Sequence, residues 1–189
     1  MRNALIIFFL GSVLVLPIKN AYSAGSGAYR LEVPDAEAMG KGSAFVAQAD
    51  NPSAVYYNPA GLTQLKGNAY VSVGTAVIQP SCTYKNASGN ETDRRRQRFV
   101  IPHTYFVSDF GLEKFTFGLG ANSYWGLGTY WAEDSFSKYI STQADYSTQD
   151  AMITGAYEIN KNISIGVGVD YANSYVNKKK KLLQPGAAD

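Results

Sequence analysis

The amino-acid sequence predicts an all-β chain whose antiparallel strands form part of a transmembrane β-barrel. Three observations lead to this prediction: a secretory signal at the start, long strands of alternating polarity, and loops that alternate between long and short. Of the 189 residues, 46% are hydrophobic, 13% are aromatic and only 17% are charged, against the roughly 25% charged residues of soluble domains. This composition excludes a disordered chain. The single cysteine, Cys82, excludes a disulfide scaffold.

The first 23 residues have the pattern of a signal peptide. A basic start at Arg2 precedes an apolar run over residues 4–18, and small residues precede a cleavage site after Ser23. The run is shorter than the ~20 apolar residues of a spanning helix, and Pro17 breaks its end. Cleavage also removes Lys19, so the 17 basic residues fall by two and match the 15 acidic ones. A nucleic-acid partner is therefore not expected.

Alternation with a period of two predicts five strands. In residues 115–122 apolar side chains alternate with Thr, Gly, Gly and Asn, and residues 163–170 repeat the pattern with Ser, Gly, Gly and Asp. Weaker alternation predicts three more strands, at residues 68–77, 98–108 and 146–158. Pro102 and His103 interrupt the alternation in the second of these. Residues 36–49 could form a short helix that Gly40 and Gly42 interrupt.

The connections between these strands favour a membrane barrel over a soluble sandwich. Residues 78–97 and 125–144 form long links, whereas residues 109–114 and 159–162 form short ones, as in outer-membrane barrels. An aromatic girdle is expected near the strand ends, from Tyr105, Tyr124, Trp125, Tyr157, Tyr171 and Tyr175. Five strands cannot close a barrel and would leave two open edges in lipid. We therefore expect the N-terminal part of a longer protein.

The stretch from Gly40 to Leu65, GKGSAFVAQADNPSAVYYNPAGLTQL, resembles the FadL family of outer-membrane transporters of hydrophobic compounds. The hatch of that family typically reads G-x-A-x-A, followed by an Asp and then N-P-A-G-L. Three further stretches are similar to the family, at Ala24-Gly25, residues 122–129 and residues 155–171. The resemblance covers nearly all of residues 1–181.

The resemblance implies a barrel of about fourteen strands, plugged by an N-terminal hatch, in the bacterial outer membrane. Residues 24–66 would be the hatch, and residues 67–189 the first five strands. Asn58-Pro59-Ala60 matches the N-P-A motif, which contacts a kink in the third strand of the family. The kink, through which ligands leave sideways into the bilayer, is expected at Gly118, Gly120, Asn122 and Tyr124.

The residue types suit such a hatch. Pro59 fixes φ, Asn58 can bond its own backbone, and Gly61 permits a positive φ, so a fixed turn is expected. Non-helical backbone at membrane depth must be enclosed by protein. The inward glycines of the two clearest strands either leave room for a plug or relieve crowding in a twisted sheet.

Other candidates are weaker. His103 is the only histidine, so a histidine metal cluster is impossible, and we expect no catalytic, cofactor-binding or metal-binding residues. Lys138, before Tyr139, is the expected partner of a ligand carboxylate by family resemblance. The basic clusters Arg94–Arg96 with Arg98, and Lys178–Lys181, would either face lipopolysaccharide phosphates or be solvated loop charges.

The sequence therefore predicts passive transport of hydrophobic compounds by a barrel that is monomeric at full length and needs no cofactor. The partners would be the hydrophobic ligand and outer-membrane lipids. Long-chain fatty acids and aromatic hydrocarbons both remain open as substrates. Two alternatives also remain: a structural or adhesive barrel, and a lipid-modifying barrel enzyme that uses His103.

Overall fold

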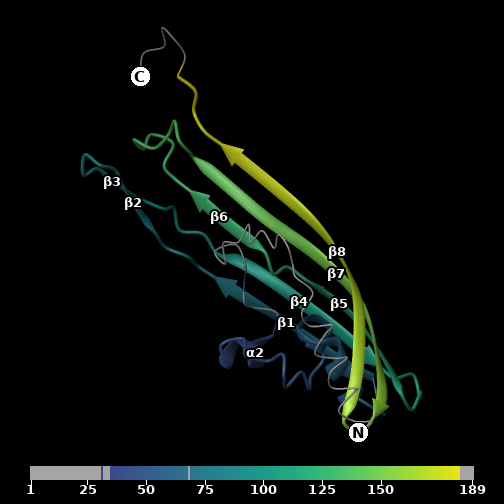
Figure 1. Cartoon of the computed structure of the whole chain (residues 1–189). Coiled ribbons are helices and arrows are strands. Elements are labelled where there is room, and N and C mark those ends of the chain that lie inside the picture. Colours follow the sequence, from purple (N-terminus) through teal and green to yellow (C-terminus); the bar gives the residue numbers. More distant parts are fainter. Residues whose placement is uncertain (1–30, 32–34, 68, 184–189) are drawn as a thin grey trace, which may run out of the picture.

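Six of the eight described strands form one strongly curved antiparallel sheet (Figure 1). The computed structural model describes residue 31, residues 35–67 and residues 69–183, so the expected signal peptide lies outside the described residues. The strand order is β1-β4-β5-β7-β6, and β8 pairs with β7 beside it. All of these pairs are antiparallel. The all-β antiparallel prediction is confirmed.

The five predicted strands are present within a few residues of their expected starts. They are β1 (Ala69–Ile78), β4 (Phe99–Ser108), β5 (Phe115–Asn122), β7 (Gln143–Asn160) and β8 (Ile163–Lys179). Three short strands were not expected, and all lie in predicted loops: β2 (Thr83–Lys85), β3 (Glu91–Asp93) and β6 (Gly126–Tyr130). The pair β2–β3 is a separate hairpin, whereas β6 adds to the main sheet.

Pro102 and His103, which interrupt the alternation in the sequence, do not interrupt the second long strand. β4 runs unbroken against β1, with Thr75 opposite Pro102. The ladder on the other side of β4 begins only at Thr104. Pro102 therefore has a paired neighbour on one side alone, which is the situation in which a strand tolerates a residue without an N–H.

The two faces of the sheet have the polarity expected for a wall in lipid. Val73 is 75% exposed and Val167 is 75% exposed, although both lie inside long strands. Other exposed apolar residues on the same convex face are Val71, Val77, Val100, Phe117, Leu119, Ile153, Ile165 and Val169. Buried polar side chains instead point to the concave face, namely His103, Thr116, Asn122, Thr148, Asp150 and Thr154. This distribution is the reverse of that in a soluble sandwich.

The expected place of Tyr105 in an aromatic girdle is wrong. Tyr171 and Tyr175 are exposed, at 72% and 62%. Tyr105 is 1% exposed, and its hydroxyl accepts a hydrogen bond from Asn122 Nδ2 at 2.9 Å. Its odd position in β4 directs it to the concave face together with His103, so it packs inside and does not face the membrane surface.

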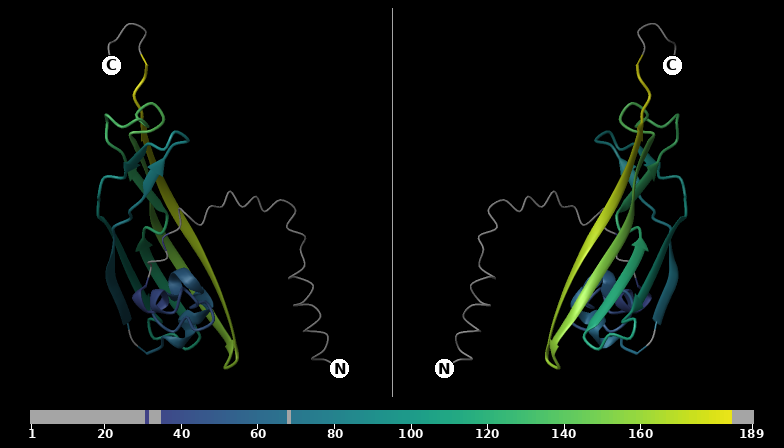
Figure 2. Two further views of the ribbon diagram at one scale, coloured as in Figure 1. Left: turned by 90° about the vertical axis from the view of Figure 1, so that its left-hand side faces the viewer. Right: turned by 90° about the vertical axis from the view of Figure 1, so that its right-hand side faces the viewer.

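Residues 35–66, here called the inner segment, lie on the concave side of the sheet (Figure 2). Their helices are α2 (Ala36–Gly40), α3 (Ala54–Tyr57) and the 3-10 helix η2 (Pro59–Gln64). Asp35 caps α2, because its Oδ1 accepts from the Ala38 N–H at 2.8 Å. The helix expected within residues 36–49 ends at Gly40. It cannot continue, because Gly42 and Ser43 have φ values of 63° and 65°, outside the helical range.

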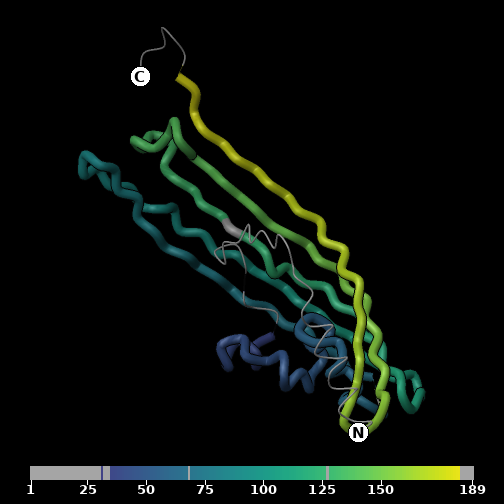
Figure 3. The backbone as a smooth tube through the Cα atoms, viewed as in Figure 1, coloured from purple at the N-terminus to yellow at the C-terminus, as the bar shows by residue number. Residues whose placement is uncertain are grey.

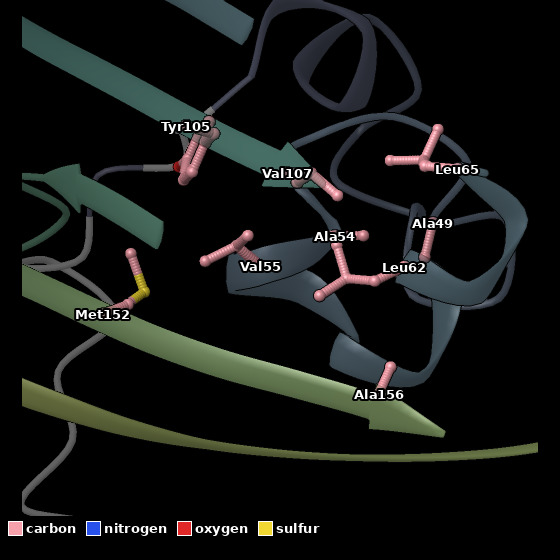
Figure 4. Close-up of a cluster of buried hydrophobic side chains, with 9 residues drawn as sticks. All are labelled: Ala49, Ala54, Val55, Leu62, Leu65, Tyr105, Val107, Met152 and Ala156. Carbon is pink, nitrogen blue, oxygen red and sulfur yellow. The ribbon is translucent and has the colours of Figure 1, made fainter. Parts of the chain in front are cut away.

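A hydrophobic cluster joins the inner segment to the sheet (Figure 4). Val55 and Leu62 of the inner segment are 2% and 0% exposed, and they pack with Val107 of β4 and Met152 of β7. The backbone trace shows the inner segment near the end of the sheet that carries the short turns, away from the β2–β3 hairpin (Figure 3). That end is called the short-turn end below, and the opposite one the long-loop end.

In the described part of the chain, no helix has both the length and the apolar character needed to cross a membrane. The three helices described have five, four and six residues.

We expect Val73→Arg to lower the free energy of unfolding in lipid by about 2–4 kcal/mol, because it places a charge at the middle of a lipid-facing strand. Urea unfolding in vesicles measures this loss. Val73→Leu is the control and should be nearly neutral. An equally small effect of both changes would contradict the assignment of the convex face to lipid.

Candidate functional site: a break in the third strand

The third long strand is broken after Asn122. β5 and β6 both pair with β7, with Asn122 opposite Asp150 and Gly126 opposite Ser147. From Asn122 to Gly126 the broken strand advances four residues, whereas β7 advances only three, from Asp150 to Ser147. The broken strand therefore holds one extra residue, as in a β-bulge. Of the expected kink residues, Tyr124 lies in the break and Asn122 borders it. Gly118 and Gly120 lie in the regular ladder of β5.

The break leaves the wall incomplete between β4 and β6. β4 pairs with β5 only over Thr104–Ser108, so residues 99–103 have no ladder on that side. A cavity of about 560 Å³ lies at this gap. Its lining is mainly apolar and aromatic and includes Ile78, Phe99, Ile101, Trp125 and Tyr130.

The cavity is lined from both faces of the wall. Val100 and Ile101 both contribute to it, and consecutive residues of a strand point to opposite faces. Val100 is 66% exposed on the convex face, whereas Ile101 is 6% exposed on the concave face. Residues of both faces of β4 therefore border the cavity.

Tyr124 connects the break to the inner segment and to β8. Its carbonyl oxygen accepts a hydrogen bond from the Leu31 N–H at 2.6 Å. Its ring centroid lies 4.8 Å from that of Tyr56 in α3. Its hydroxyl donates to Asp170 Oδ2 at 2.5 Å. Three separate parts of the chain therefore meet at one residue of the break.

The motif Asn58-Pro59-Ala60 forms the start of η2. Asn58 Oδ1 accepts from the Ala60 N–H at 3.2 Å, and Asn58 Nδ2 donates to the Val46 carbonyl at 3.0 Å. A Cβ on Gly166 of β8 would lie 2.3 Å from Ala60 N and 2.5 Å from Pro59 C. The motif thus packs on the fifth long strand. Tyr56 and Leu31 contact the break itself, and η2, which the motif opens, also contacts β5.

Comparison with known proteins fits this architecture. Residues 20–185 match the family described as "Outer membrane protein transport protein (OMPP1/FadL/TodX)". The chain belongs to this family. The suspected FadL resemblance, the location in the bacterial outer membrane and the β-barrel fold class are thereby confirmed, and the sheet is part of a barrel wall.

Relatives of the chain are distant and longer. Outer membrane protein P1 of Haemophilus influenzae is 24% identical over 188 residues, which cover 87% of this chain and 41% of that protein. The long-chain fatty acid transport protein of Salmonella typhi is 26% identical over 170 residues, covering 84% and 37%. The crystal structure of a Pseudomonas aeruginosa FadL homologue has a TM-score of 0.50 at 20% identity, covering 66% and 33%. The chain thus spans less than half the length of these relatives.

Glycines on the concave face of this FadL-family sheet lie where the inner segment approaches most closely. A Cβ on Gly118 would lie 2.5 Å from Val55 Cγ2, and one on Gly120 would lie 2.9 Å from Val55 Cγ1. Gly61 has a different role from the one expected. Its φ is not positive, but a Cβ there would lie 2.3 Å from the Ala49 carbonyl oxygen, so close approach is what requires glycine.

The inner segment is fastened to the sheet at the short-turn end. Lys66 forms an ion pair with Glu158 of β7, and its Nζ also donates to the Glu113 carbonyl at 2.5 Å. Asp109 Oδ2 accepts from the Gly67 N–H at 2.6 Å, and Oδ1 accepts from the Gly111 N–H at 2.9 Å. The hydrogen bond from Gly67, and to a lesser extent that from Gly111, holds the pKa of the Asp109 carboxyl below its ordinary value.

The surroundings of two basic residues, Arg94 and Lys138, differ from those expected for their roles. Arg94 does not face solvent, because it is 6% exposed and donates to the Gly128 carbonyl at 2.6 and 3.0 Å and to the Pro80 carbonyl at 2.6 Å. Its guanidinium also lies 5.5 Å from the Phe99 ring centroid. Lys138 is not among the cavity-lining residues, and its Nζ lies 5.0 Å from the ring of Tyr139.

His103 is buried at 9% exposure beside the Tyr105 ring, 5.8 Å between centroids. Its Nδ1 has no hydrogen-bond partner among the described residues. A side-chain Cβ on Gly74 would lie 2.5 Å from His103 Nε2. The imidazole therefore fills the space that a glycine leaves on the neighbouring strand.

We expect Gly166→Val to push the Asn58-Pro59-Ala60 turn away from β8, because the new side chain needs space that the turn backbone occupies. In the complete protein, ion conductance across a planar bilayer should rise several-fold as the inner segment loosens. Gly155→Val is the matched control, since the nearest atom to a Cβ there is 3.7 Å away. Equal conductance of the two variants would contradict this packing.

We expect Asp109→Asn to lower the melting temperature at neutral pH, since the charged carboxylate accepts two backbone hydrogen bonds. A lowered folded pKa means that this stabilisation is present above the unfolded value, about 3.9 for Asp. It is lost as the pH falls through the lower folded value. The difference between wild type and variant should therefore vanish in strong acid. A difference that does not change with pH would contradict this role.

Proposed function

We propose that the complete protein is a passive channel for hydrophobic compounds across the bacterial outer membrane, with release sideways through the break in the third strand. The observation that carries the proposal is the cavity at the break, which is lined by adjacent residues of opposite faces, Val100 and Ile101. A path with this lining would let an apolar molecule pass from the interior of the barrel into lipid.

The proposal includes a hatch formed by residues 24–66. Of these, the described residues 35–66 pack against the concave face of β5, β7 and β8 near the short-turn end. A plug there would obstruct a straight path out of that end and favour the side path. Asn58, Pro59 and Ala60 would hold the plug to β8, and Tyr56 would hold it to Tyr124.

Fatty acids are the substrate class that we propose for this path. Two relatives, from Salmonella typhi and Escherichia coli, are named long-chain fatty acid transport proteins. Partitioning into apolar sites would supply the driving force, at about 0.8 kcal/mol per buried CH₂ group. Transport of this kind needs no chemical step, so we propose a channel and not an enzyme.

Lipopolysaccharide remains a proposed partner of the long-loop end, in a protein that we propose is a monomeric barrel at full length. The exposed cations Arg95, Arg96 and Lys178–Lys181 lie there, and phosphate groups pair well with such side chains. The burial of Arg94 removes it from this set.

We expect Ser123→Trp to reduce uptake of radiolabelled oleate several-fold in cells, because Ser123 lines the cavity and an indole would fill part of the path. Thr104→Trp is the matched control, since Thr104 is exposed on the convex face of β4 and is not among the cavity-lining residues. Heat-modifiable migration in gels verifies that both variants fold.

Cells without the gene supply the baseline for this assay. Normal oleate uptake in the deletion strain would favour the structural or adhesive alternative. If the deletion strain is defective and Ser123→Trp restores uptake as fully as wild type, the transport proposal stands but the proposed side path is contradicted. Lipid hydrolysis that disappears in His103→Ala would instead favour the enzyme.

A further inference from the structure

The cavity at the break has one basic side chain in its described lining, Arg98. Arg98 directly precedes β4, so it lies where the wall ends at the long-loop side. Its Nε donates to Gln79 Oε1 at 3.2 Å. No carboxylate of the described residues lies within ion-pair distance of it. Its charge is thus available to a ligand.

The neighbouring arginine shows what a purely structural role looks like. Arg94 is buried, and all its recorded hydrogen bonds go to backbone carbonyls, of Gly128 and Pro80. It also covers the Phe99 ring, and Phe99 and Gly128 line the cavity. Arg94 therefore shapes the wall of the cavity, while Arg98 adds an exposed, weakly engaged cation at its edge.

The described lining also holds one carboxylate, Asp145, and its charge does not neutralise Arg98. Asp145 Oδ2 accepts from Gln143 Nε2 at 2.5 Å. Its Oδ1 would lie 3.4 Å from a Cβ on Gly128. It thus sits on the β6–β7 side of the cavity, whereas Arg98 and Gln79 lie on the β4 side.

We propose that the cavity binds single-chain carboxylates, with the carboxylate on the Arg98 guanidinium and the alkyl chain against Phe99, Ile101 and Trp125. The inference rests on the proposed release through the break, and it deepens that function by selecting fatty acids over neutral hydrocarbons. A guanidinium can take a carboxylate through two parallel hydrogen bonds. The apolar lining would then take the chain, at a position where the carboxylate stays near the membrane surface.

Arg98 replaces Lys138 as the expected partner of a ligand carboxylate. Lys138 does not line the cavity, and its ammonium lies over the Tyr139 ring. The two assignments differ in a measurable way, because only Arg98 touches the space beside Trp125. Trp125 therefore serves as a reporter for a ligand in this cavity.

The test uses the complete protein as its gene encodes it, purified in a neutral detergent, with dibromostearic acid and its methyl ester as probes. Bromine quenches indole fluorescence at contact, and the part of the quenching that Trp125→Phe removes belongs to the cavity. The acid should bind about fivefold more tightly than the ester or better. Arg98→Gln should bring the two probes to equal affinity, and Arg98→Lys should keep part of the preference.

Arg96→Gln is the matched control, because Arg96 lies in the same exposed segment but does not line this cavity. It should keep the full preference for the acid. High salt should weaken binding of the acid and not of the ester in the wild type, a result that does not depend on any variant folding.

The outcomes separate this inference from the proposed function. Equal affinity of acid and ester in the wild type overturns the role of Arg98 while the side path stands. Loss of the preference in Lys138→Gln, but not in Arg98→Gln, returns the role to Lys138. Stronger displacement of the probe by an alkyl phosphate than by the alkyl carboxylate assigns the site to phosphate and overturns the proposal. Quenching of Trp125 by neither probe contradicts the side path itself.

Discussion

In hydrocarbon every backbone N–H and C=O must find a partner within the protein, and the rest of this structure depends on that constraint. A ladder of antiparallel strands satisfies it, and a break in a strand violates it locally. Three backbone groups at the break have other partners. The Tyr124 carbonyl accepts from the Leu31 N–H, and the Trp125 carbonyl accepts from the Thr148 N–H at 3.1 Å. The Trp125 N–H donates to Thr148 Oγ1 at 3.3 Å. An N-terminal residue and a neighbouring strand therefore supply part of the bonding that the break removes from the ladder.

The same constraint explains why small residues line the concave face opposite the inner segment. Non-helical backbone can lie at membrane depth only when protein surrounds it closely. Gly118, Gly120 and Gly166 allow α3 and η2 to approach the wall to contact distance, where any side chain would collide. On the convex face the alternate positions are Val, Ile, Leu and Phe, whose contact with lipid needs no partner. The same period-two alternation thus places lipid-contacting side chains on one face and the packing surface for the inner segment on the other.

Much of the fold could be predicted from the sequence, because alternation is a local property. Phe115–Asn122 and Ile163–Asp170 carry strong alternation, and both lie in strands as expected. β6 was missed, since five residues with two glycines give too little pattern, and only pairing with β7 makes them a strand. The environment of Arg94 was also out of reach, because its partners Gly128 and Pro80 lie far away in sequence. The packing of Pro59 and Ala60 on Gly166 of β8 was likewise out of reach, as no local signal encodes which strand a turn will meet.

The meeting of three contacts at Tyr124 has a consequence for gating in the proposed channel. If the inner segment moves, Tyr56 leaves the Tyr124 ring, and movement of Leu31 leaves the Tyr124 carbonyl without its donor. An unsatisfied carbonyl in an apolar setting is costly, so the break must rearrange or admit a polar replacement when the segment departs. The hydrogen bond from Tyr124 to Asp170 would still join the break to β8. In the proposed channel, movement of the inner segment would therefore reach the break through the contacts of one residue, Tyr124.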